Sequence, residues 1–116
     1  MLNGRQHSLI YIDTQPIFIF NEKAEVKSVN PAFLEMTGFT NEKEALGVGF
    51  LKAIPKENRQ ETLSQIEDFV KHGGTFASEI ILQNIDTKEI IKTYCRIESI
   101  KNKEVIIEAV GTLKQI

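Results

Sequence analysis

The only thiol of the 116-residue chain belongs to Cys95. A cysteine acts as a nucleophile when a nearby base or positive charge stabilises its thiolate. Cys95 falls in a segment where apolar and charged residues alternate, on the side that holds Thr93 and Ile97 and is expected to face the core. We therefore expect a buried, unreactive cysteine. A lone cysteine forms no disulfide within the chain, which favours a cytoplasmic setting.

The other residues that could transfer protons are expected at the surface. His72 ends the longest predicted helix and is followed by Gly73, so its imidazole is expected to point outward and to interact with the helix dipole. Carboxylates pair along predicted helix surfaces among lysines and arginines, without the apolar setting that would raise a carboxyl pKa for acid catalysis. These pairs are Glu42/Glu44, Glu57/Glu61 and Glu67/Asp68.

Composition and missing motifs exclude several other classes of function. The sequence has no Walker loop, no dinucleotide-binding glycine pattern and no zinc-ligand spacing. Lys and Arg total 14 against 16 Asp and Glu, so no nucleic-acid partner is expected. The longest apolar runs, at 9–12 and 16–20, fall far short of the roughly 20 residues that span a bilayer, and no direct membrane contact is expected.

The elements that must position these residues begin with a predicted hairpin of strands at 16–20 and 25–29. Asn30 is typical of a helix N-cap, and Pro31 is typical of the first helical position, so a short helix is predicted over 31–37. A second helix is predicted from Asn41 to Gly47, with Glu44 completing a capping box. Another single turn is expected within 48–54. Residues 1–15 have no clear period and are expected to form an arm or a short helix.

The second half of the sequence predicts one long helix and three strands. Apolar residues recur at helical spacing over 56–71. Alternating segments at 75–83, 89–100 and 104–113 predict strands, and the short turns between them imply antiparallel pairing. Residues 16–116 are thus expected to form one α+β domain, in which a five-stranded antiparallel sheet carries short helices and one longer helix on one face.

The outer face of this sheet is not fully polar. It is expected to expose an apolar stripe, and stripes of this kind mark contact surfaces. Either the N-terminal arm or a second subunit is expected to cover it, and we predict a homodimer that forms through this face, through the N-terminal arm, or through both. The stripe consists of Ile81, Tyr94, Ile106 and Val110.

Several segments, in this order, resemble the PAS family of sensory domains. The clearest are Val29-Asn30-Pro31-Ala32-Phe33, Thr37-Gly38-Phe39-Thr40 and Glu44-Ala45-Leu46-Gly47. The start of the long helix at 55–59 and the final strand at 111–116 are also similar, and the resemblance covers roughly residues 14–116. Two departures concern the end of the chain: Gln115 replaces the family's usual Asp, and no Thr follows Ile116. They put in doubt the family's coupling contact to the next segment.

The resemblance implies a ligand pocket between the inner sheet face and the helices. Such a lining would suit a small, mostly apolar ligand. Alternatively, the side chains would fill the space and leave a closed core. The matching Asn of the family also lies near the pocket mouth. The expected lining is Asn30, Phe33, Met36, Phe50, Leu51, Ile66, Val70, Ser78, Ile80, Thr93, Cys95, Ile107 and Ala109.

Two cofactors of the family are not expected here. Light-sensing flavin members carry a reactive cysteine in the helical half, where this sequence has none, and it also lacks the tryptophan that often stacks on flavin. Some haem-binding members take an iron ligand from the long helix, but His72 is expected to point outward. The expected cofactor is none or an unidentified small ligand.

The resemblance implies a non-catalytic sensory and dimerisation domain of a bacterial-type signal transduction protein. A ligand or partner would alter the sheet, and the last strand would relay the change to a C-terminal effector, a histidine kinase or a diguanylate cyclase. Two alternatives stay open. One is a small α+β enzyme of isomerase or thioesterase type, which needs an ionisable residue in the pocket. The other is a protein-interaction domain that binds no ligand.

Overall fold

The computed structural model describes the backbone of residues 14–102 and 105–116, and their side chains except at 102 and 105–107. The predicted arm at 1–15 therefore falls almost wholly outside the described residues. The described elements, in chain order, are β1 (Ile17–Phe20), β2 (Val26–Val29), α2 (Pro31–Thr37), α3 (Glu42–Ala45), the 3-10 helix η1 (Gly49–Ala53), α4 (Lys56–His72), β3 (Thr75–Gln83), β4 (Ile90–Asn102) and β5 (Val105–Gln115).

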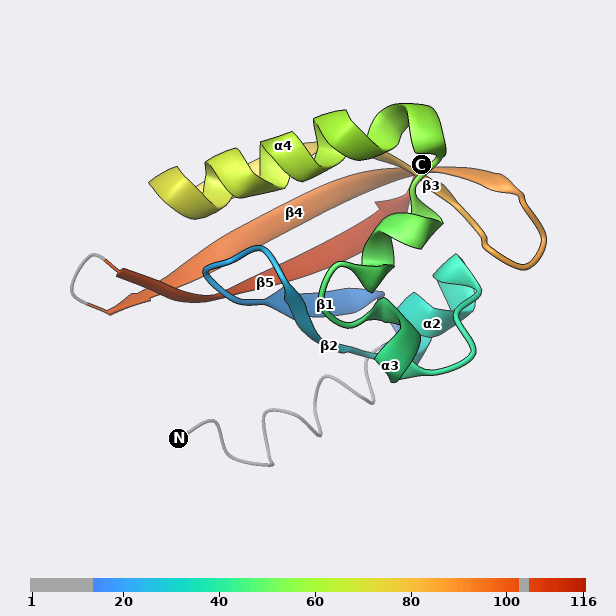
Figure 1. The fold of residues 1–116 in the computed structure, drawn as a ribbon, viewed down its shortest axis with the longest axis horizontal. Helices are drawn as coiled ribbons and strands as arrows, with labels where there is room; N and C mark the ends of the chain where they lie inside the picture. The colour runs from blue at the N-terminus through green and yellow to red at the C-terminus, as the bar shows by residue number, and fades with distance from the viewer. Residues whose placement is uncertain (1–13, 103–104) are drawn as a thin grey trace.

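The five strands form one antiparallel sheet in the order β2-β1-β5-β4-β3. The last strand thus lies at the centre of the sheet, paired with β1 on one side and β4 on the other. Figure 1 shows α4 running along the sheet beside β4, while α2, α3 and η1 gather near β1 and β2. The predicted α+β architecture is confirmed.

The helix ends follow the capping signals of the sequence. The Asn30 side chain caps α2 by accepting from the Phe33 N–H, and α2 ends at Gly38, whose φ of 82° is left-handed. The capping box of Asn41 and Glu44 is present at α3. Here α3 ends at Ala45, two residues before the predicted end at Gly47, which instead forms a β-bridge with Val26.

Gly111 lets the central strand pass beneath an aromatic ring. It lies directly opposite Phe18 in the pairing of β1 with β5. A Cβ at this position would overlap the Phe18 ring, which is held inside the core. The absence of a side chain at 111 therefore makes room for Phe18.

We predict that Gly111→Ala destabilises the fold by about 1–3 kcal/mol, because overpacking forces a core ring off its rotamer. Urea unfolding followed by circular dichroism measures the change. The double variant Gly111→Ala/Phe18→Leu should be less destabilised than the sum of its two single variants, since Leu frees part of the space. Additive losses would contradict the assigned clash.

Candidate functional site

A small cavity lies between the sheet and the helices, where the family resemblance implies a ligand pocket. Its volume is about 50 Å³. Ligand pockets usually measure roughly 300–1,000 Å³, so this space holds at most a very small molecule. All five strands, the turn between β1 and β2, the helices α2, η1 and α4, and the segment between η1 and α4 contribute to the lining. The lining residues are Phe18, Phe20, Ala24, Val26, Phe33, Thr37, Phe50, Ala53, Ile54, Thr62, Ile66, Phe76, Ile80, Leu82, Cys95, Ile97 and Leu113.

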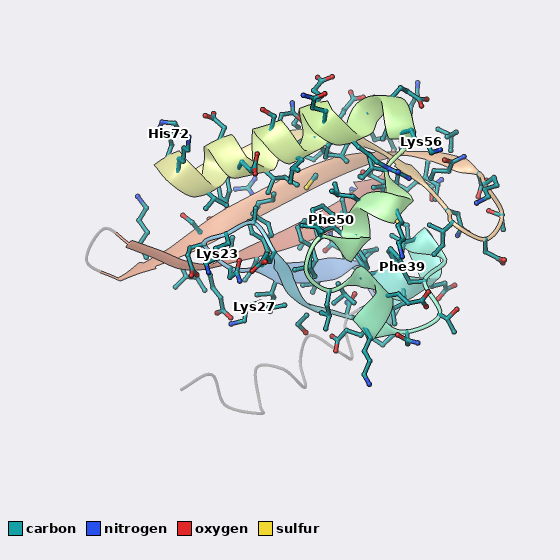
Figure 2. All side chains as sticks on the ribbon, in the orientation of Figure 1. Lys23, Lys27, Phe39, Phe50, Lys56 and His72 are labelled. Carbon is teal, nitrogen blue, oxygen red and sulfur yellow. The ribbon has the colours of Figure 1, made fainter. Side chains whose placement is uncertain are left out.

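Five phenylalanine rings line this cavity. Six of the seven phenylalanines form one continuous series of ring contacts, with centroids 5.9 to 6.5 Å apart. Such pairs add stability beyond the area they bury. The seventh, Phe50, lines the cavity from η1, and Figure 2 shows it between the helices and the sheet. In order, the series is Phe39, Phe33, Phe18, Phe20, Phe69 and Phe76.

The polarity of the lining is low. No charged side chain is among the lining residues. The Thr37 hydroxyl is already used, because it donates to the Phe33 carbonyl at 2.7 Å. Burial raises the pKa of the Cys95 thiol to about 12, so this thiol is neutral at physiological pH. The cavity therefore offers a ligand mainly apolar contacts.

The sequence-based pocket residues fall into three groups. Phe33, Phe50, Ile66, Ile80 and Cys95 line the cavity. Met36, Leu51 and Val70 pack against the core from partly buried positions, Ala109 and Thr93 are fully buried and Ser78 is half-buried. The Thr93 hydroxyl donates to the Ile80 carbonyl at 2.7 Å, so it serves the sheet. Ile107 lies on β5, and its side chain is outside the described residues.

Asn30 acts as a structural connector. Its Oδ1 accepts from the backbone N–H of Ile17 at 2.9 Å and from that of Phe33 at 3.0 Å. Its Nδ2 donates to the Gln15 carbonyl at 2.8 Å, and the side chain has no exposed surface. One amide thus joins the start of β1 to the start of α2. The capping role predicted from the sequence is confirmed.

Sequence reasoning omitted several lining residues that could have been found. Phe76, Leu82, Ile97 and Leu113 lie at alternate strand positions on the inner face. The alternation identified their face correctly but did not show which of them meet the helices. Phe18 and Phe20 lie in an all-apolar strand, where alternation gives no signal.

The predicted outer stripe is partly described. Tyr94 is 45% exposed, and Ile81 and Val110 are half-buried. The side chain of Ile106 lies outside the described residues.

His72 is 72% exposed in its side chain, and its Nδ1 lies 2.9 Å from the Asp68 carbonyl. The predicted outward position of His72 is therefore correct (Figure 2).

Within the described residues, no group of three or more His, Cys, Asp or Glu side chains could hold a metal ion. Across the same residues, every helix is too short or too polar to cross a bilayer.

Comparison with known proteins identifies the family. The PAS domain family profile matches residues 13–70, which is half of the chain. The arrangement of sheet and helices is also that of solved PAS domains. The chain belongs to the PAS domain family.

Solved structures show the same fold. The PAS domain of a protein from Colwellia psychrerythraea is 13% identical, with a TM-score of 0.79 over 97% of this chain and 95% of that one. A PAS domain from a two-component sensor histidine kinase is 12% identical, with a TM-score of 0.74 and the same coverages. The Rhodobacter sphaeroides LOV protein is 18% identical, with a TM-score of 0.78 over 97% of this chain and 66% of that one. No curated protein matched the sequence.

Haem and flavin do not fit the residues of this site. Each is far larger than the cavity of about 50 Å³. The residues that would have to move are the phenylalanines of the continuous series, which are packed against one another. A pocket for either group would therefore require these packed rings to separate.

We predict that Asn30→Ala lowers the free energy of unfolding by about 2–4 kcal/mol, because the buried Ile17 N–H loses its acceptor and the Phe33 N–H keeps only the Asn30 backbone carbonyl, at 3.0 Å. Chemical denaturation measures the loss. Asn41→Ala removes the exposed N-cap of α3 and is the matched control, with an expected loss of about 1 kcal/mol. Equal losses at the two positions would contradict the connecting role of Asn30.

We predict that alkaline pH destabilises the protein through Cys95. In the unfolded chain the thiol ionises near its ordinary pKa of about 8.5, whereas the folded thiol stays protonated to about 12. The unfolded state therefore binds fewer protons above pH ~8.5, and stability falls as pH rises, by about 2 kcal/mol at pH ~10. Urea unfolding across this range, compared with Cys95→Ala, isolates the effect. An identical slope in the variant would contradict it.

Proposed function

We propose that this chain is a non-catalytic sensory and dimerisation PAS domain of a bacterial-type signalling protein. The observation that carries the proposal is the filled space between sheet and helices. Aromatic rings occupy it and leave about 50 Å³ without a charged lining residue. Such a core suits a domain that responds to partner contacts or to a very small apolar ligand, and it does not suit one built around a large cofactor.

The enzyme alternative has less support. An isomerase or thioesterase pocket needs an ionisable group held in apolar surroundings. The buried polar residues in the described part of the chain are Asn30, Thr37, Thr62 and Thr93, and none of them ionises near neutral pH. The ligand-free interaction module remains the second candidate, because the closed cavity fits it equally well.

The position of β5 supports a route for the signal. This strand pairs with β1 and β4, so a change in the packing of either half of the sheet reaches it. We propose that β5 passes the change to a C-terminal effector, a histidine kinase or a diguanylate cyclase. A solved PAS domain from a sensor histidine kinase has the same fold, which supports this class of output. A cytoplasmic location belongs to the same proposal.

The dimer is proposed to form through the outer sheet face. Tyr94 and Val110 contribute apolar surface on this face, beside the half-buried Ile81. The opposite face carries α4 and is closed by the core. Contact through the outer face would leave the cavity unchanged and would place β5 of each copy in the interface.

Native mass spectrometry at micromolar concentration tests this function. We expect a dimer whose mass equals two polypeptide chains, or two chains plus a very small ligand. Val110→Arg should raise the dimer dissociation constant at least tenfold, since it places a charge in an apolar contact. Ser64→Arg on the exposed side of α4 is the control and should leave it unchanged. A mass increment of haem or flavin size, or an unaffected Val110→Arg dimer, would overturn the proposal.

A further inference from the structure

The two edge strands of the sheet, β2 and β3, differ in whether another segment covers them. At the β2 edge the Val26 N–H donates to the Gly47 carbonyl at 2.8 Å, and the Gly47 N–H donates back at 2.9 Å. The Glu42 carboxylate accepts from the Val29 N–H at 3.0 Å. The segment around α3 therefore covers this edge, as folded proteins usually do to prevent further strand pairing.

The β3 edge has no such cover. Residues 75–83 pair with β4 over their whole length, without a bulge. Among the described residues, no backbone hydrogen bond reaches 75–83 from the side away from β4. The strand contains no proline, and Glu79 is its single charge. A long, regular and nearly uncharged edge of this kind is a template for strand addition.

We propose that β3 of a second copy occupies this edge. The two β3 strands run antiparallel about a two-fold axis at Ser78 and join the two sheets into one. A two-fold contact uses the same edge of both copies, so one interface covers both open edges. This contact is separate from the outer-face dimer, and it does not depend on the sensory function proposed above.

The charge of Glu79 selects the register. An axis at Glu79 would place the two carboxylates opposite each other, which is destabilising. With the axis at Ser78, Glu79 faces Ala77 of the second copy. Ala77 pairs with Arg96 in the sheet, and its small side chain leaves room for that guanidinium to reach across. Arg96 is solvent-exposed and its described ion pair is with Glu98 on the same strand, at 3.2 Å, so it is available to Glu79.

The inner row of side chains supports the same register. It places Phe76, which is half-buried, opposite Ile80 of the second copy, so that the two cores become continuous. An axis at Ile80 would instead set Phe76 against Asn84, whose side-chain carbonyl caps the turn between β3 and β4. Compared with the registers centred on Glu79 and Ile80, the Ser78 register sets Phe76 against Ile80 and brings Glu79 near Arg96 of the second copy.

Disulfide trapping tests the edge contact and separates it from the outer-face dimer. The experiment uses the full chain with Ser78→Cys in the Val110→Arg background, at about 100 µM under mild oxidation. Ser78 lies on the inner side of the sheet, so outer-face contact keeps two such residues apart, whereas edge pairing brings their Cα atoms within about 5.5 Å. We expect crosslinking at least tenfold faster than for Glu67→Cys, an exposed position on α4. Cys95 lies directly opposite Ser78 in the pairing of β3 with β4, so both cysteine variants also carry Cys95→Ala, which prevents an intramolecular disulfide.

A charge reversal tests the register without a new thiol. Glu79→Lys places a cation beside Arg96 of the second copy, and we expect sedimentation equilibrium to show edge association about tenfold weaker. Glu67→Lys makes the same charge change on α4 and should have no effect. A Val110→Arg protein that stays monomeric at about 100 µM, or Ser78→Cys crosslinking no faster than the Glu67→Cys control, overturns the proposal.

Discussion

The packing of phenylalanine rings between sheet and helices is the constraint on which the rest of the structure depends. The series from Phe39 to Phe76 joins the segment after α2 to β1, α4 and β3. Because protein interiors are close-packed, these rings set the distance between the layers and leave only the small cavity. Gly111 is part of the same constraint, since any larger residue would displace the Phe18 ring. What can bind between the sheet and the helices is therefore decided by the packing of the core.

The hydrogen bonds of the buried Asn30 side chain complement this apolar packing. The short strand β1 and the two-turn helix α2 would each be marginal alone, because few backbone bonds hold them. The Asn30 side chain bonds the backbone at Gln15, Ile17 and Phe33 at once, in a site closed to water. A buried amide that makes all of these hydrogen bonds stabilises the fold, whereas a buried amide without hydrogen-bond partners lowers the free energy of unfolding. This residue consequently fixes how the helical half sits on the sheet.

The sequence was sufficient for most of the fold and for part of the site. Capping signals at Asn30, Gly38 and Asn41 and strict alternation in β3, β4 and β5 are local, so they could be predicted. The cavity lining could not, because it depends on which inner-face residues of different strands meet α4 and η1. Ser78 and Thr93 were assigned to the correct face, yet both lie outside the lining, and Phe18 was hidden in an all-apolar strand. The order of the strands in the sheet could not be predicted either, because it is set by packing between residues far apart in the sequence.

The position of β5 is compatible with the proposed relay, although the core is nearly closed. A close-packed interior has few alternative arrangements, so a shift of one ring must be taken up by its neighbours. Phe18 contacts two rings of the series and also lies against Gly111 on β5. A displacement that starts at α2 or α4 therefore reaches the central strand through direct contacts. This coupling needs no large ligand, and it depends on the tight packing that excludes one.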